Sequence, residues 1–541
     1  MKYINQLLQQ KQISGGIAYL LLGLLTVGVY GSSLGNGFTW DDYMVLVDNT
    51  FVHSLDNLPK VFSREYLTSP SQLPNIDTGK AGSGEGSYRP VATLIHFFEY
   101  YAWELNPFFY HCVNLLLHVF NVCLVYGLLY RLFKHSGIAF VTAALFAVHP
   151  AHSEAVLGIS FREDLLAANF SLLMFYWFLD KPKRWLSLGA YFLALFSKEM
   201  TIMVLPLLFI YKYFFTKDRF SMSDAFKTFY GYALVSIFYL WIRFSVMAPH
   251  DDFQAFYPAA TLWGNVLVNL KVLGMYFTWL FTGIGVRVTI ADAAFAQVTF
   301  FSAYVVICLG VLLFVIRSIT QSKEDRSLLV FACLWFGFIL LPVLNIIPIY
   351  NPIASRYLYL PSIGFYLFIA VLGSRFLQLN SQKAYLFIYV VFLSVMTLAR
   401  SYVWQDEVSL RKEFYREYPH NVEIYRSLSG AYMREKNNDQ EVLWLLKGLN
   451  EFPHNDSLHL DLAVFHRKRG LYEEALKYTD RLLSLDPKHY HGLSERCVIL
   501  GLWQKKDESM ACFEEGMRLY PTSEHFKINY ESSREYFGGK K

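Results

Sequence analysis

The chain is short of charge for its length. Only 17% of its 541 residues are charged, whereas 54% are hydrophobic and 18% are aromatic. A soluble protein of this size would need more polar surface. The formal net charge of +4 is too small to indicate nucleic-acid binding. The six cysteines include no Cys-x-x-Cys pair, so we expect buried thiols, no disulfide framework and no zinc site.

Long apolar runs recur from Ile17 to about Leu398 and then stop. The N-terminus lacks a small-residue cleavage site after the first run, so we expect that run to be a retained span. We predict an all-α membrane protein, with a polytopic domain over 1–400 and a soluble domain over 401–541. A crossing helix needs about 20 mostly apolar residues. About eleven spans are expected on that principle: 15–34, 110–133, 137–150, 164–180, 185–198, 199–216, 227–247, 299–317, 328–349, 358–376 and 383–399.

Basic residues in the connecting segments set the orientation. The clusters after the second, fourth, sixth, eighth and tenth spans fall on one side if 262–284 does not cross, and the positive-inside rule makes that side the cytoplasm. Trp263 and the mid-segment Lys271 favour an interfacial helix for 262–284. The first loop, 35–109, and the C-terminal domain then face outside. The glycine-rich stretch 79–87 in that loop lacks the spacing of a phosphate-binding loop. We interpret it as a linker, with ordering by substrate as the alternative.

Prolines mark a repeat in the soluble domain. Pro419, Pro453, Pro487 and Pro521 recur every 34 residues, which is the tetratricopeptide period. We therefore predict a short α-solenoid with a concave surface suited to binding a peptide or protein.

The first candidate site is Trp40-Asp41-Asp42, just after the first span. Removing two carboxylates from water at a membrane surface costs free energy, so we expect this pair to have a function. Adjacent carboxylates do not share one face of an extended segment, so we expect different tasks for them. One would accept a proton and the other would orient an acceptor or bind a cation. The alternative is a solvated loop or a helix N-cap.

Several cationic side chains are predicted on the same side. A phosphate leaving group needs positive charge where negative charge develops, and Arg and Lys supply it in different geometries. The alternative for each is a structural ion pair, such as Lys198 with Glu199 or Glu163. His111 and His118 are expected to be hydrogen-bonded core residues. The cationic candidates are Arg89, His149, His152, Arg162, Lys198 and Arg356.

The order of several motifs resembles the transmembrane and tetratricopeptide-repeat O-mannosyltransferase family. The resemblance covers the whole chain, including the repeats after the last span. The matching segments are Phe38–Asp42, Tyr88-Arg89-Pro90, Asn106–His111 with Asn114 and His118, Ala147–Val156, Arg162–Ala167, Lys198-Glu199 and Arg356–Ser362.

The resemblance implies a GT-C glycosyltransferase fold and transfer of a sugar, mannose or another hexose, from a polyprenyl- or dolichyl-phosphate to Ser or Thr of a protein held in the repeat groove. It implies Asp41 as general base, Asp42 as its neighbour at the acceptor, and Arg162, Lys198 and Arg356 at the lipid phosphate. Further candidates near the acceptor or supporting the site are Arg89, His149, His152, Glu163, Asp164 and Tyr357. No third ligand is evident beside the doublet, so a Mg²⁺ or Mn²⁺ ion stays an open alternative and no metal ligand is assigned. The repeat array is shorter than in the animal members of the family, which bears on the acceptor more than on the chemistry. We expect a prokaryotic member in the cytoplasmic membrane; a eukaryotic member would lie in the endoplasmic reticulum.

Two rival functions remain open. A related GT-C enzyme could use a lipid or glycan acceptor. A non-catalytic membrane scaffold would use the repeats to recruit proteins, and it predicts that Asp41 lies far from the outside cations. A transporter is disfavoured because the ionisable residues cluster at span ends and not at mid-membrane.

Overall fold

A computed structural model describes residues 15–63, 88–215, 221–246, 261–286, 302–322, 325–346, 351–376 and 380–538. These parts of the chain are helical, with no strand among them. The chain divides into two compact units, Met1–Asp406 and Glu407–Lys541. Each unit is described by itself below.

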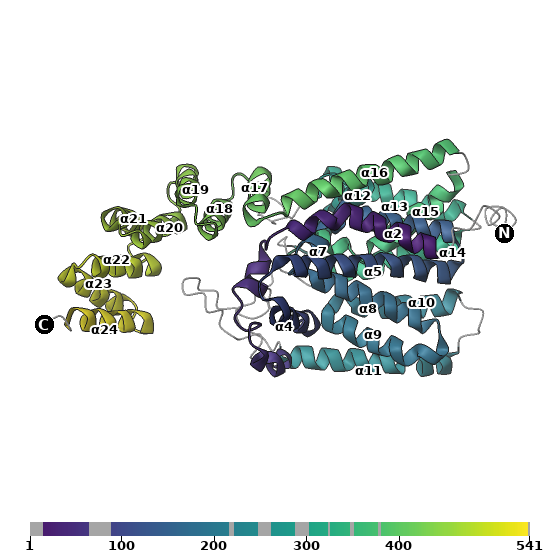
Figure 1. The fold of residues 1–541 in the computed structure, drawn as a ribbon, viewed down its shortest axis with the longest axis horizontal. Helices are drawn as coiled ribbons and strands as arrows, with labels where there is room; N and C mark the ends of the chain where they lie inside the picture. Colours follow the sequence, from purple (N-terminus) through teal and green to yellow (C-terminus); the bar gives the residue numbers. More distant parts are fainter. Residues whose placement is uncertain are drawn as a thin grey trace. The chain divides into compact units, whose positions relative to one another are not determined.

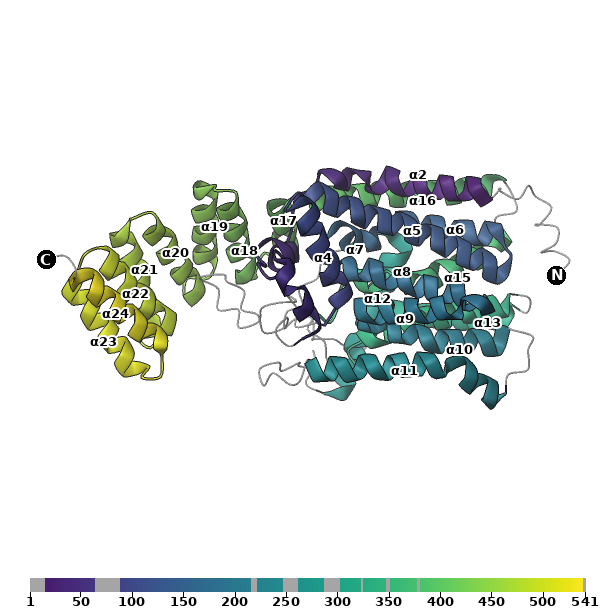
Figure 2. The ribbon, with the colours of Figure 1, turned by 60° about the horizontal axis from the view of Figure 1, so that its bottom comes forward.

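The first unit is a bundle of helices that run side by side (Figures 1 and 2). Each predicted span contains a described helix, because a long apolar run satisfies its backbone groups in a membrane most simply as a helix. The helices are α2 (Gly15–Tyr30), α5 (Pro107–Phe133), α6 (Ser136–Val148), α8 (Arg162–Phe178), α9 (Arg184–Ser197), α10 (Val204–Phe215), α11 (Met222–Val246), α12 (Leu262–Thr282), α13 (Ala303–Gln321), α14 (Arg326–Leu340), α15 (Ser362–Phe376) and α16 (Asn380–Val403).

Six helices among the described residues are long and apolar enough to cross a membrane, which makes this a multi-pass membrane protein. They are Gly15–Gly35, Pro107–Phe133, Ser223–Val246, Ala303–Gln321, Arg326–Val343 and Lys383–Val403. The helices Ser136–Val148 and Pro150–Leu157 form a further pair bent by 55°. The expected number of eleven spans stays a prediction, as does the interfacial position of 262–284. α12 is not among those six helices; it packs against α13, and residues such as Val268 and Val272 are fully buried.

Short elements gather at the end of the bundle where α2 ends and α5 begins (Figure 2). They are η1 (Gly31–Gly35), η2 (Tyr43–Val47), η3 (Leu55–Phe62), α4 (Pro90–Trp103), η4 (Pro150–His152), α7 (Ser153–Leu157), η6 (Glu199–Met203) and η9 (Ser355–Leu358). Both α4 and α5 begin with a proline, which lacks the N–H that a first helical turn leaves unpaired. The glycine-rich stretch 79–87 lies outside the described residues.

The second unit is a run of paired helices. They are α17 (Glu407–Glu417), α18 (Val422–Arg434), α19 (Asn438–Glu451), α20 (Asp456–Lys468), α21 (Tyr472–Leu485), α22 (Tyr490–Leu502), α23 (Lys506–Leu519) and α24 (Glu524–Gly538). The helices after Pro419, Pro453 and Pro487 start at equivalent places, since Asn421, Asn455 and His489 each accept a bond from a backbone N–H of the following helix. The pairing therefore recurs with the spacing of the prolines. The assignment of these pairs as tetratricopeptide repeats stays a prediction.

One expectation about the cysteines is wrong. Cys497 of α22 and Cys512 of α23 form a disulfide, with Cα atoms 5.3 Å apart. The sequence gives no spacing signal for it, because the two residues meet only after α22 and α23 fold back on each other. Cys112, Cys123, Cys308 and Cys333, which lie in apolar runs, are free thiols as expected, but only Cys308 is buried and the other three are partly exposed.

Candidate functional site

The two carboxylates of the acidic doublet lie in different surroundings. Asp42 is fully buried, whereas Asp41 is partly exposed. The preceding Trp40 has a φ of 50°, a conformation that residues other than glycine seldom adopt. This backbone turn starts the short helical segment that carries both acids. A strained residue beside two carboxylates is typical of a functional site.

Asp42 is a tether. Its Oδ2 accepts a hydrogen bond from Thr39 N at 3.0 Å, and its Oδ1 accepts one from Ser160 N at 2.7 Å. Bonds from backbone N–H groups to a carboxylate are among the stronger hydrogen bonds in proteins. Asp42 therefore fixes the first loop to the segment just before α8, and so fixes the position of its neighbour Asp41.

Phe161, next to Ser160, links the doublet to Arg356. Its ring centroid lies 5.6 Å from that of Trp40, and the Arg356 guanidinium carbon lies 4.3 Å from the Phe161 ring centroid. Arg356 also lies 5.3 Å from the ring of Tyr357. Trp40, which directly precedes the two acids, and Arg356 thus both contact the Phe161 ring.

Arg356 is held by Glu154 of α7. The Glu154 carboxylate pairs with the Arg356 guanidinium, and its Oε2 accepts bonds from Arg356 N at 2.9 Å and from Ser355 Oγ at 2.8 Å. Both charged side chains are buried. A buried charge is stable only while its partner is in place. Glu154 therefore neutralises the Arg356 guanidinium and also orients η9.

Lys198 and Arg89 belong to a chain of alternating charges. Lys198 Nζ lies 2.6 Å from Asp164 Oδ2 and 3.8 Å from Glu163 Oε1, and Arg89 donates to the same Glu163 oxygen at 2.6 Å. Lys198 Nζ also lies 5.7 Å from the ring centroid of Tyr357, on which Arg356 converges. Lys198 and Arg356 are therefore brought to one aromatic side chain.

Arg162 is bound by three partners. Its Nε donates to Asn114 Oδ1 at 2.6 Å, one terminal nitrogen donates to the Tyr110 carbonyl at 2.9 Å, and the other pairs with Glu99. Burial raises the pKa of Glu99, but the charges and hydrogen bonds of Arg162 and His96 outweigh it and hold that pKa below its usual value. The guanidinium thus joins α4, α5 and α8.

His149 and His152 lie in a separate, fully buried polar network. His149 Nδ1 accepts from Ala151 N at 3.1 Å and its Nε2 lies 3.1 Å from the Leu280 carbonyl oxygen. His152 Nδ1 lies 2.8 Å from the Phe146 carbonyl oxygen and its Nε2 lies 2.9 Å from Ser362 Oγ. His149 thus connects the break after α6 to α12, and His152 connects it to α15. Neither ring is among the contacts described above for Arg89, Lys198 and Arg356.

The prediction that His111 and His118 are hydrogen-bonded core residues is confirmed. His111 Nε2 lies 3.2 Å from the Gly37 carbonyl oxygen, and His118 contacts Tyr359 Oη at 2.7 Å. Within the described ranges, no group of three or more His, Cys, Asp or Glu residues could hold a metal ion. A divalent cation therefore stays an untested expectation.

Three supporting residues were not among the sequence candidates: Glu99, Glu154 and Phe161. Glu154 lies inside a matched motif and Phe161 directly precedes one, yet nothing in their spacing identifies their partners. Glu99 had one usable signal, because a carboxylate in the otherwise apolar stretch Pro90–Trp103 requires a buried cation.

The described geometry is suited to displacing a phosphate. It includes a partly exposed carboxylate, Asp41, and the cations Arg356, Lys198 and Arg89, of which Arg356 contacts the same Phe161 ring as Trp40. A carboxylate can accept a proton from a hydroxyl, and fixed cations can stabilise charge developing on a leaving oxygen.

The family resemblance is confirmed by comparison with curated proteins. The chain is 24% identical over 523 residues to the human protein O-mannosyl-transferase TMTC3, which covers 87% of this chain and 55% of that protein. It is 28% identical over 452 residues to the Caenorhabditis elegans protein O-mannosyl-transferase F38B6.6, covering 78% of this chain and 61% of that protein. A shorter match, 37% identical over 166 residues, is to mouse protein O-mannosyl-transferase TMTC1 and covers 30% of this chain and 17% of that protein. The chain spans little more than half the length of the first two relatives. No family model matches it.

Proposed function

We propose that this chain is a membrane glycosyltransferase that moves mannose from a polyprenyl- or dolichyl-phosphate to a Ser or Thr hydroxyl of a protein. The observation that carries the proposal is the junction at Ser160 and Phe161, where the acidic doublet meets the segment next to Arg356. The relatives are named protein O-mannosyl-transferases, which supports mannose as the sugar and protein as the acceptor.

The proposed reaction is a single displacement. Asp41 takes the proton of the acceptor hydroxyl as that oxygen forms a bond to the anomeric carbon. The bond from this carbon to the phosphate oxygen breaks, the electron pair leaves with the phosphate, and the configuration inverts. One base and no second nucleophile are needed, which fits a doublet in which Asp42 is already bound to two backbone N–H groups.

Arg356 and Lys198 are the proposed phosphate contacts. Both lie near the Tyr357 ring: Lys198 Nζ is 5.7 Å and the Arg356 guanidinium carbon is 5.3 Å from its centroid. Arg162, by contrast, uses three nitrogens on Asn114, Tyr110 and Glu99. We therefore assign Arg162 to positioning α4 and α5, and Arg89, Glu163 and Asp164 to holding Lys198.

The site and the C-terminal unit are proposed to face the non-cytoplasmic side. The basic-loop count supports this side, and so does the Cys497–Cys512 disulfide, since disulfides persist in oxidising compartments. The groove of the helix pairs would hold the acceptor protein near the site and raise its effective concentration.

The test is transfer by the purified full chain. A polyprenyl-phosphate carrying radiolabelled mannose is supplied with a Ser/Thr peptide library and with a lipid extract, with and without EDTA. We expect label on peptide hydroxyls, and loss of that label in Asp41→Asn but not in Asp56→Asn, an exposed acid of the same loop. Label found in the lipid fraction alone would replace the protein acceptor by a lipid one.

A further inference from the structure

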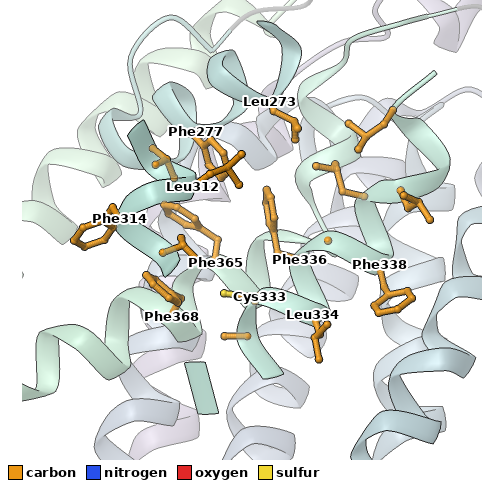
Figure 3. Close-up of a pocket in the computed structure, with 18 of the residues that line it drawn as sticks. Leu273, Phe277, Leu312, Phe314, Cys333, Leu334, Phe336, Phe338, Phe365 and Phe368 are labelled. Atoms are coloured by element: carbon orange, nitrogen blue, oxygen red, sulfur yellow. The ribbon is translucent and has the colours of Figure 1, made fainter. Parts of the chain in front are cut away.

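A cavity of about 440 Å³ lies between α12, α13, α14 and α15. Figure 3 shows phenylalanine rings from these helices around it. Its lining consists of apolar side chains, glycines and the thiol of Cys333. Small-molecule sites commonly enclose about 300–1,000 Å³. With no charged group in the lining, the cavity suits an uncharged, apolar ligand of that size.

The cavity reaches the outer surface of the bundle. Leu312 and Phe314 of α13 line it, yet they are 40% and 48% exposed. α13 is one of the helices apolar enough to cross a membrane. An opening beside α13 therefore faces lipid, and a hydrocarbon chain can enter it directly from the bilayer without crossing water.

One end of the cavity adjoins the segment that carries Arg356. Leu341 and Leu344 line this end, where the chain leaves α14 on its way to η9. On the facing helix, Phe277 lines the cavity while its neighbour Tyr276 accepts a hydrogen bond from Ala354 N at 3.3 Å. Ala354 lies two residues before Arg356. A single ligand can thus place a charged head group at Arg356 and an apolar chain in the cavity.

We infer that the cavity holds the isoprenoid chain of the sugar carrier whose phosphate is bound near Arg356 and Lys198. This inference rests on the proposed function and deepens it, because it names the part of the chain that recognises the carrier's hydrocarbon. Rings that pack against one another, such as Phe281 with Phe365 at 4.8 Å between centroids, form the wall that the isoprenoid contacts.

Photo-crosslinking tests occupancy without any substitution. The probe is a polyprenyl phosphate with a diazirine on its isoprenoid chain, added to the full chain in phosphatidylcholine nanodiscs. We expect labelled peptides from α12, α13 and α14, and competition by unlabelled polyprenyl phosphate. Labelling that maps elsewhere, or that added phosphatidylcholine displaces equally well, would overturn the inference.

Substitutions then connect the cavity to turnover. Leu312→Trp fills the cavity, whereas Leu313→Trp is the matched control, because Leu313 is the next residue, is 68% exposed and does not line the cavity. We expect Leu312→Trp to raise the KM for a long-chain donor at least tenfold and to leave a donor with two isoprene units unchanged. An unchanged long-chain KM would overturn the inference.

The two proposals fail separately. If sugar is transferred but the photoprobe labels other helices, the proposed function stands and the cavity assignment falls. If the photoprobe labels the cavity but no donor transfers sugar to any acceptor, the carrier-binding inference stands and the proposed transferase falls.

Discussion

The ion pairs of the two units differ in how deeply they are buried. Around the candidate site in Met1–Asp406, the pairs Arg162–Glu99, Arg356–Glu154 and Lys198–Asp164 bury both partners. In Glu407–Lys541, pairs such as Arg426–Asp461 and Arg496–Asp480 are partly exposed. Removing charge from water is costly, so buried pairs are kept where a fixed geometry matters. The comparison indicates that the first unit uses buried ion pairs to hold a site, whereas the pairs Arg426–Asp461 and Arg496–Asp480 of the second unit are partly exposed contacts between helices.

The largest effect is expected from breaking a buried pair. Arg356→Met should destabilise the first unit by about 3–5 kcal/mol, because Glu154 is left as an uncompensated buried charge. Unfolding in detergent measures this. The double variant Glu154→Leu/Arg356→Met should recover most of the loss while transfer stays abolished. A double variant no more stable than the single one would contradict the assignment of the pair.

The disulfide of the second unit should contribute slightly less. It closes a loop of 15 residues, for which chain entropy predicts about 3 kcal/mol. We expect Cys497→Ser/Cys512→Ser to lower the unfolding free energy of the second unit by about that amount. The first unit should be unaffected, as followed by proteolysis at each unit. Equal sensitivity of the protein with and without reductant would show that the bond does not form.

Acid should release the Arg162–Glu99 pair. Glu99 has its pKa lowered in the fold from an ordinary value of 4.5. Its stabilising effect is therefore present above pH 4.5 and is lost as the pH falls through the lower folded value. We expect the stability difference between the unsubstituted protein and Glu99→Gln to be constant above about pH 5 and to shrink below it. A difference that grows on acidification would have the wrong sign.

The smallest effect is expected from the partly exposed pairs of the second unit. Arg426→Ala should cost only about 0.2–1 kcal/mol, since Arg426 and Asp461 are each about 30% exposed and water screens their attraction. Thermal unfolding in low and high salt measures it, with the smaller loss at high salt. A loss as large as that of Arg356→Met would remove the contrast between the units.

The sequence predicts the helices well and the contacts of the site only in part. Long apolar runs impose helices, and the proline spacing matches the helix pairs, because both signals are local. The adjacency of Asp41 and Asp42 predicts different tasks for them, and the two side chains do differ in burial. The partners Glu99 and Glu154 were not, because Glu99 pairs with a residue 63 positions away and Glu154 with one 202 positions away. Such pairings depend on how helices pack, and so does the proximity of Cys497 to Cys512.

The most direct measurement compares the two acids of the doublet in the same transfer assay. Asp41→Asn should reduce kcat by about 10²–10⁴-fold, the usual contribution of a general base. Asp42→Asn should lower stability by about 1–3 kcal/mol, because an amide cannot accept from both Thr39 N and Ser160 N. Full transfer by Asp41→Asn would contradict the account.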